Sequence, residues 1–245
     1  MNSGAFEDVL PGGLRTPSSV FISGTSRPLL KWVALALLAP SSSRVYWTCV
    51  RLAGEELEPL DPMTLGVVPD ERIHILQPHD LQPEDQEARR AESAAGQMLR
   101  SDEEADSVQR IFDFLRLPSH TQERLSTTFR DQEPAILIAA NAHRLVGLYT
   151  SDSIGPVIRS IVGSGACLVA LWADAPPKLR SVFDLVLRVE GNGPASWRDA
   201  TLTCEKGIDT GPLAGGTPVR LAELPTVASV LERSLPSASQ HWAVP

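Results

Sequence analysis

The stretch Gly24–Lys31, which reads GTSRPLLK, comes closer than any other part of the chain to a phosphate-binding loop. It directly follows a short apolar run, Ser19–Ser23, that predicts a first strand, and it leads into an apolar helix. In α/β folds the first strand–helix turn is the usual phosphate site, because the amides at a helix start point toward an anion. The stretch is therefore the first place to look for nucleotide chemistry.

Alignment with the phosphate-loop pattern GxxxxGK[ST] keeps only the first glycine, Gly24. Leu29 stands at the second glycine, where a side chain resists curling of the backbone around phosphate. Leu30 replaces the lysine that neutralises the phosphates, and Lys31 replaces the hydroxyl that binds Mg²⁺ and would repel the ion. These losses predict that the chain does not carry out ordinary ATP hydrolysis.

Residual anion binding at this turn stays open. Thr25, Ser26 and Arg27, together with amides at the helix start, could still hold a phosphate. An unorthodox nucleotide-binding protein or NTPase could use Arg27 and Lys31 in place of the lysine. It would need a carboxylate from elsewhere, for which the candidates are Asp152 and Asp174. The alternative interpretation is a plain strand–helix turn with an exposed arginine.

Asn141 and His143 follow a continuous apolar strand, 134–140, and are expected to face the same cleft as the Gly24 turn. A histidine there could act as a base or a ligand, although a polar loop residue is the simpler interpretation. His79 and Asp80 could contribute to a metal site, but no third ligand is near them in the sequence. We therefore predict no catalytic residue and no metal.

Composition and charge limit the class of protein. The chain has 245 residues, 42% hydrophobic and 21% charged, which is ordinary for a globular protein. A net charge of −8 argues against a nucleic-acid coating protein. A DNA-associated role would instead require a local basic face, for which the candidate arginines are Arg89, Arg90, Arg100 and Arg110.

The cysteines and the apolar segments point to a cytoplasmic protein that does not span a membrane. Cys49, Cys167 and Cys204 each lie in an apolar run without ligand spacing, which predicts reduced, buried thiols. The N-terminus shows no secretory signal. The most apolar segment, 32–39, is far shorter than the roughly 20 residues that cross a bilayer.

Strands that alternate with helices predict an α/β fold whose central sheet is mostly parallel, with helices on both faces and an antiparallel C-terminal hairpin at the edge. We expect strands at 19–23, 44–52, 72–76, 134–140, 166–172 and 185–189, and a hairpin formed by 200–205 and 219–221. We expect helices at 29–39, with Pro28 at the first position, at 108–115, after Ser119, at 154–162 and at 226–232, and a short helix or turn at 176–182.

One domain is favoured, since no internal repeat or strong linker is visible. Residues 1–17 are predicted to be a flexible lead-in, 18–234 the α/β domain, and 235–245 a disordered tail. Within the domain, the polar stretch 82–106 is predicted to be an exposed helix or a mobile insertion.

The order of these elements resembles that of the RecA-like P-loop ATPases, particularly the KaiC/RadA branch. The resemblance covers about Ser19–Leu221 as a pattern of elements, carried by RVYWTCV, ILIAANAHRL, ACLVALWADAPPKL, FDLVLRVEG and TLTCEKG. In that family the strand similar to ILIAA ends in an aspartate that orders Mg²⁺, whereas this chain has Ala139, Ala140 and Asn141. The family's glutamate after the second strand has no counterpart, because Glu55 and Glu56 come several residues too late.

The resemblance therefore implies a degenerate member that lacks intact Walker motifs. Such a chain would be a catalytically silent, regulatory or scaffolding protein that acts through protein–protein contacts, as a homo-oligomer or as the partner of an active ATPase. This interpretation requires no cofactor, whereas the nucleotide-binding alternative would take ATP.

Overall fold

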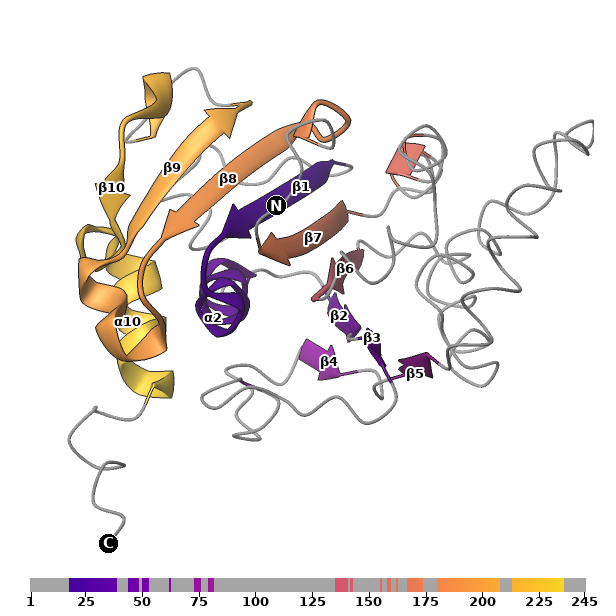
Figure 1. Ribbon diagram of the computed structural model, residues 1–245, viewed down its shortest axis with the longest axis horizontal. Coiled ribbons are helices and arrows are strands. Elements are labelled where there is room, and N and C mark those ends of the chain that lie inside the picture. Colours follow the sequence, from indigo (N-terminus) through magenta and orange to yellow (C-terminus); the bar gives the residue numbers. More distant parts are fainter. Residues whose placement is uncertain are drawn as a thin grey trace, which may run out of the picture.

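The computed structural model describes residues 18–38, 44–48, 50–52, 73–75, 79–81, 135–140, 167–173, 180–207 and 213–235, with single helical positions at 62, 142, 155, 158, 159 and 162. In this part of the chain, strands of one central sheet lie beside a long buried helix and a second, C-terminal helix (Figure 1). No described helix is long and apolar enough to cross a membrane.

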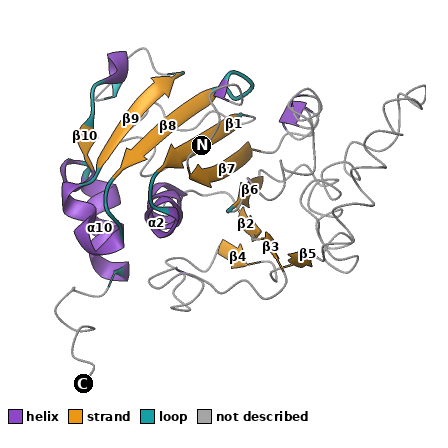
Figure 2. Ribbon diagram, in the orientation of Figure 1, coloured by secondary structure: helices purple, strands orange, loops and turns teal. Residues whose placement is uncertain are grey.

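Among the described residues, the central sheet has eight strands in the order β10-β9-β8-β1-β7-β6-β2-β4. The six from β8 to β4 run parallel, whereas β9 and β10 are antiparallel additions beside β8 (Figure 2). The sheet is thus mostly parallel, as predicted, and β10 forms only a two-residue edge. The strands are β1 (Ser19–Gly24), β2 (Arg44–Thr48), β4 (Ile73–Ile75), β6 (Ala135–Ala139), β7 (Cys167–Ala173), β8 (Leu185–Glu190), β9 (Thr201–Lys206) and β10 (Val219–Arg220).

The prediction of one strand over 44–52 is wrong. The stretch forms β2 and a separate strand β3 (Val50–Leu52), and β3 pairs in parallel with β5 (His79–Leu81) in a second, two-stranded sheet. β-Branched and aromatic residues suit any half-buried strand, so their run did not reveal where the chain changes sheets.

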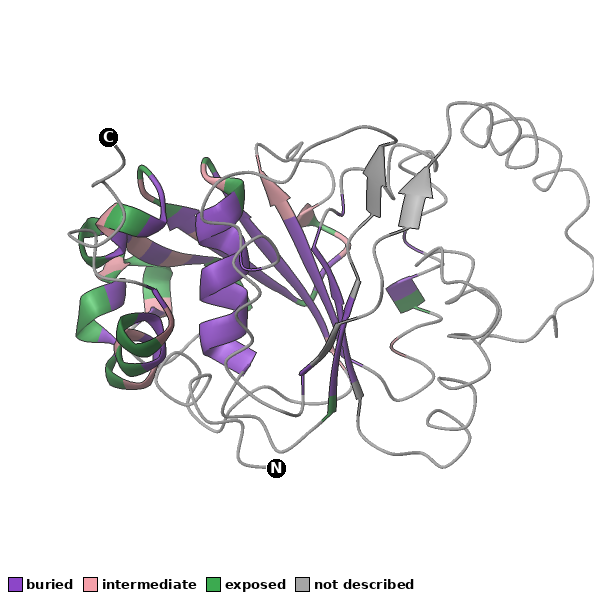
Figure 3. Cartoon of the chain, turned by 90° about the horizontal axis from the view of Figure 1, so that it is seen from below, coloured by how far each residue is buried: buried purple, intermediate pink, exposed green. Residues whose placement is uncertain are grey.

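Both described α-helices of more than one turn pack on the same face of the sheet. α2 (Arg27–Leu38) is buried from Pro28 to Leu38 and shares one apolar core with β1, β7 and β8 (Figure 3). α10 (Pro225–Ser234) adds Val227, Val230 and Leu231 to that core. Helix α2 starts at Arg27, so Pro28 is its second residue and not, as predicted, its first. Shorter 3-10 turns lie at η1 (Pro194–Asp199), η2 (Ala214–Gly216) and η3 (Leu221–Glu223).

The predicted helices at 108–115 and after Ser119, the stretch 82–106, and the segments 1–17 and 236–245 fall outside the described residues. Within the predicted helix 154–162, the described positions 155, 158, 159 and 162 are helical. Cys49 is likewise outside, whereas Cys167 and Cys204 are free and buried, as predicted.

Successive side chains of β1 point to opposite faces of the sheet. Val20 and Ile22 belong to the core beneath α2, so Phe21 points to the opposite face. There its ring lies 4.9 Å from that of Phe183 and 6.5 Å from that of Trp172, centroid to centroid. Apolar packing therefore covers this second face in the region of β1 and β7.

A side-chain clamp fixes the start of β1 against β8. The carboxylate of Asp184 accepts hydrogen bonds from the backbone N–H and the hydroxyl of Ser19, both at 2.8 Å. The N–H of Asp184 lies 3.1 Å from both the hydroxyl and the carbonyl oxygen of Ser19. Because these bonds join the residue before β8 to the first residue of β1, they set the register that pairs Val20 with Leu185.

The buried thiol of Cys167 gives a first prediction. Burial raises the pKa of Cys167 to about 12, and its sulfur lies 3.6 Å from the Ser18 hydroxyl. Iodoacetamide at neutral pH should leave Cys167 unmodified in the native protein and modify it in guanidinium, as measured by peptide-resolved mass spectrometry. Equal alkylation rates in the two states would contradict the burial.

The same shift predicts a pH dependence of stability. The folded chain holds the Cys167 proton more tightly than the unfolded chain, whose thiol has a pKa near 9.0. The contribution of this thiol to the free energy of unfolding should therefore fall as the pH rises from 9.0 toward about 12. Cys167→Ala should flatten that part of the profile in denaturant titrations.

Candidate functional site

The predicted phosphate turn lies at the carboxyl end of β1, where a doubly wound sheet usually binds ligands. Only Thr25 and Ser26 separate the end of β1 from the start of α2. Leu29 and Leu30, which align with the second glycine and the lysine of the phosphate-loop pattern, therefore lie in the first turn of α2 and are 1% and 2% exposed. The segment that would have to wrap around phosphate is already helical.

Ser26 closes the start of this helix with its own atoms. The N–H of Leu29 lies 3.4 Å from the Ser26 hydroxyl oxygen, and the N–H of Leu30 donates to the Ser26 carbonyl at 3.0 Å. Pro28 has no N–H to offer. The Leu30 bond is the ordinary bond to the carbonyl four residues back, as in any α-helix. Pro28 and Leu29 are thus the two residues of the first turn whose amides are lost to an anion, which weakens this helix start as a phosphate site.

Gly24 is required by the neighbouring strand. A Cβ added at Gly24 would lie 2.1 Å from the carbonyl oxygen of Val189 and 3.0 Å from a methyl carbon of Leu30. Gly24 pairs with Val189 in the β1–β8 register. The close approach of two strands accounts for this glycine without any ligand.

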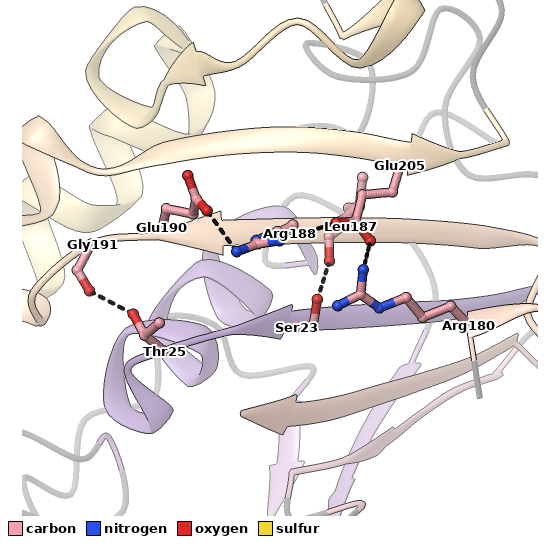
Figure 4. A network of polar contacts seen from close by, with 8 residues as sticks. All are labelled: Ser23, Thr25, Arg180, Leu187, Arg188, Glu190, Gly191 and Glu205. Carbon is pink, nitrogen blue, oxygen red and sulfur yellow. Dashed lines mark hydrogen bonds and ion pairs between the residues drawn. The ribbon is translucent and has the colours of Figure 1, made fainter. Parts of the chain in front are cut away.

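The loop after β8 fills the other side of the turn. The Thr25 hydroxyl donates to the carbonyl oxygen of Gly191 at 3.2 Å (Figure 4). A Cβ added at Gly191 would lie 2.8 Å from a methyl carbon of Leu29 and 2.7 Å from the Cβ of Ala200. Gly193, with φ 139°, continues this loop, and a Cβ there would lie 3.9 Å from the Ser26 hydroxyl oxygen. The turn is thus in direct contact with the chain's own loop at Gly191, on the side of Thr25 and Leu29.

The two cations proposed to replace the missing lysine lie in different environments. Arg27 is exposed at the first residue of α2, whereas Lys31, one turn later, is only 4% exposed. An enclosed lysine is poorly placed to meet a nucleotide that arrives from solvent. Asn141, His143, Asp152 and Asp174 lie outside the described residues.

The turn therefore contains Gly24, Thr25, Ser26 and Arg27, as predicted, but it does not form an open loop. His74 belongs to β4 of the central sheet, whereas His79 and Asp80 belong to β5 of the other sheet. In the part of the chain that the structure describes, no group of three His, Cys, Asp or Glu side chains could hold a metal ion.

A second polar group, which the motif search missed, lies on the sheet face opposite α2. Arg188 on β8 pairs with Glu190 at 2.8 Å and with Glu205 of β9 at 3.6 Å (Figure 4). Arg180 pairs with Glu205 at 2.6 Å. These four side chains form one network, and Ser23 lies beside it, with its hydroxyl 3.4 Å from the Leu187 carbonyl oxygen.

A sequence signal for this network existed. Along β8 the charged residues Arg188 and Glu190 alternate with the apolar residues Leu187 and Val189, a period of two that predicts a strand with one face toward water. The prediction of a strand over 185–189 did not use that alternation.

The comparisons with known proteins do not assign the chain. A scan against protein-family models found no match. A search of curated proteins also found none.

The contact at Gly24 gives a prediction with a built-in control. Gly24→Ala should destabilise the protein by about 3 kcal/mol, because the new methyl group meets a backbone carbonyl that cannot move aside cheaply. Gly215→Ala, at φ 70° with no atom within 4 Å of the new Cβ, should cost only about 1 kcal/mol. Urea titrations of both variants measure the difference, and equal losses would contradict the close approach.

Proposed function

We propose that this chain is a catalytically silent RecA-like domain that acts as a regulatory or scaffolding protein through protein–protein contacts. The observation that carries the proposal is the closed β1–α2 turn, in which Ser26 accepts hydrogen bonds from Leu29 and Leu30 and Leu29 packs against Gly191. Phosphoryl transfer depends on positioned amides, cations and a metal. A turn that is closed by the chain's own atoms supports the proposal that the domain acts through contacts on its surface and not through phosphoryl transfer.

The strand order helps to choose between the RecA-like fold and other doubly wound folds. In the Rossmann and flavodoxin-like orders the first two strands of the sheet are neighbours. Here β7 and β6 lie between β1 and β2, and β1 is flanked by β7 and β8. The order thus speaks against those two folds and is compatible with the RecA-like proposal.

The alternative, a nucleotide-binding protein that uses Arg27 and Lys31, has one observation in its favour. Arg27 is exposed at the start of α2, where an anion could approach it. The burial of Lys31 and the short turn weigh against it.

Thermal-shift and calorimetric titrations with ATP, ADP and GTP, with and without Mg²⁺, separate the two proposals, and released phosphate is assayed in parallel. The silent domain predicts no shift, no heat and no phosphate. A ligand at about 100 times its Kd would add about 2.7 kcal/mol of stability and a clear rise in melting temperature. A shift that Arg27→Ala abolishes, while Arg198→Ala does not, would overturn the proposal in favour of the alternative.

A further inference from the structure

The face of β8 and β9 that points away from α2 carries a compact set of charges, which we call the charged face. Its members are Arg180, Arg188, Glu190, Thr201, Thr203 and Glu205. The side chains of Arg188 and Glu190 are 43% and 52% exposed, although they lie in β8, the third strand from the edge that β10 forms. Both described α-helices of more than one turn pack on the opposite face. Because its two central side chains are about half exposed, another macromolecule can reach the charged face.

Its charges balance and alternate in sign. The two arginines and the two glutamates sum to zero, in a chain whose net charge is −8. Arg188 lies between Glu190 and Glu205 along the sheet, so opposite charges are neighbours on one surface. Such a surface does not favour a strongly basic or strongly acidic partner, because either would meet as much repulsion as attraction.

We propose that the charged face binds a second copy of this chain in a two-fold symmetric dimer. In such a dimer the two-fold axis lies in the interface and passes over β8 between residues 188 and 190. Arg188 of each copy then lies over the partner's Glu190. The same rotation turns β8 of the two copies antiparallel. The inference rests on the proposed function, in which the domain acts through protein–protein contacts, and it names a second copy of the chain as the partner.

The ion pairs within one chain do not prevent pairing across the dimer. A guanidinium has five N–H donors and a carboxylate about four acceptor positions. Arg188 forms ion pairs with Glu190 and Glu205, and a guanidinium with five donors can bind a further carboxylate of the second copy. Each exposed pair alone contributes little, but the symmetry makes two copies of each cross-pair and joins them into one network.

An aromatic anchor lies next to the charged face. Register places Trp172 of β7, Ser23 of β1, Arg188 of β8 and Thr203 of β9 in one row across the sheet. Trp172 is half-buried at the end of its strand, on the same face as Phe21. Tryptophan and arginine are the residues that most often dominate the energy of interfaces, and here the buried Ser23 lies between Trp172 and Arg188 in the row.

Sedimentation velocity of the full chain, from about 1 to about 100 μM, tests the dimer. The wild-type chain should show a concentration-dependent dimer that weakens in high salt. Arg188→Glu leaves only negative charge at 188 and 190, and Glu190→Arg leaves only positive charge. Each variant alone should raise the dimer Kd by about tenfold or more, because like charges then face each other across the axis.

Mixing the two charge-reversed variants tests the proposed pairing of Arg188 with the partner's Glu190 more directly. When the Arg188→Glu and Glu190→Arg chains are mixed, with one of them fluorescently labelled, they should form a mixed dimer with near wild-type affinity. The double variant R188E/E190R should again pair with itself. Arg198→Glu is the matched control: its side chain is 64% exposed and pairs with Glu232 on α10, so the dimer should not change. Circular dichroism melts check that each variant folds.

A wild-type chain that stays monomeric at all these concentrations would overturn the dimer. A dimer indifferent to both charge reversals would overturn the charged face as its interface. Neither result affects the proposed silent domain, which fails only if a nucleotide binds or is hydrolysed.

Discussion

The approach of β1 to β8 at Gly24 is the constraint on which the rest of the described structure depends. At that point a single methyl group would lie 2.1 Å from the Val189 carbonyl oxygen, so the two strands can be this close only with glycine. At the other end of the pair, Asp184 holds Ser19 by its N–H and its hydroxyl. From this fixed strand, α2 starts after only two residues, and its apolar surface is buried over β1 and β7.

This short connection explains why the turn at the carboxyl end of β1, where such sheets usually bind ligands, is closed by the chain's own residues. The short turn brings Leu29 into the first helical turn, where it packs on Gly191, and it lets Ser26 accept hydrogen bonds from the first helical amides. The glycine that resembled the start of a phosphate loop is thus part of strand packing. The partly exposed charged side chains lie elsewhere, on β8 and β9, where Arg188 pairs with two carboxylates on the face of the sheet opposite α2.

Much of this architecture was predictable, because the parallel strands of the core are continuous apolar runs and α2 is apolar nearly all round. The positions of β1, β6, β7, β8, β9 and α10 came close to the predicted ranges. The division of 44–52 between two sheets was not predictable, since pairing partners far along the chain decide it. For the site, the lost phosphate-loop residues were visible in the sequence, but the capping by Ser26 and the contact of Leu29 with Gly191 depend on three-dimensional packing. The charged network was missed because Arg188 and Glu205 come together only through strand pairing.

The central claim is that the β1–α2 turn is closed by its own hydrogen bonds and side chains. Amide-resolved NMR tests it most directly, by following the backbone N–H signals of Thr25 to Lys31, other than Pro28, during hydrogen exchange and during a titration with Mg²⁺–ATP. We predict that the Leu29 and Leu30 amides exchange slowly and that no signal in the turn shifts with nucleotide. Fast exchange at Leu29 and Leu30, together with saturable shifts at Thr25, Ser26 and Arg27, would mean that the turn opens to hold phosphate and would contradict the account.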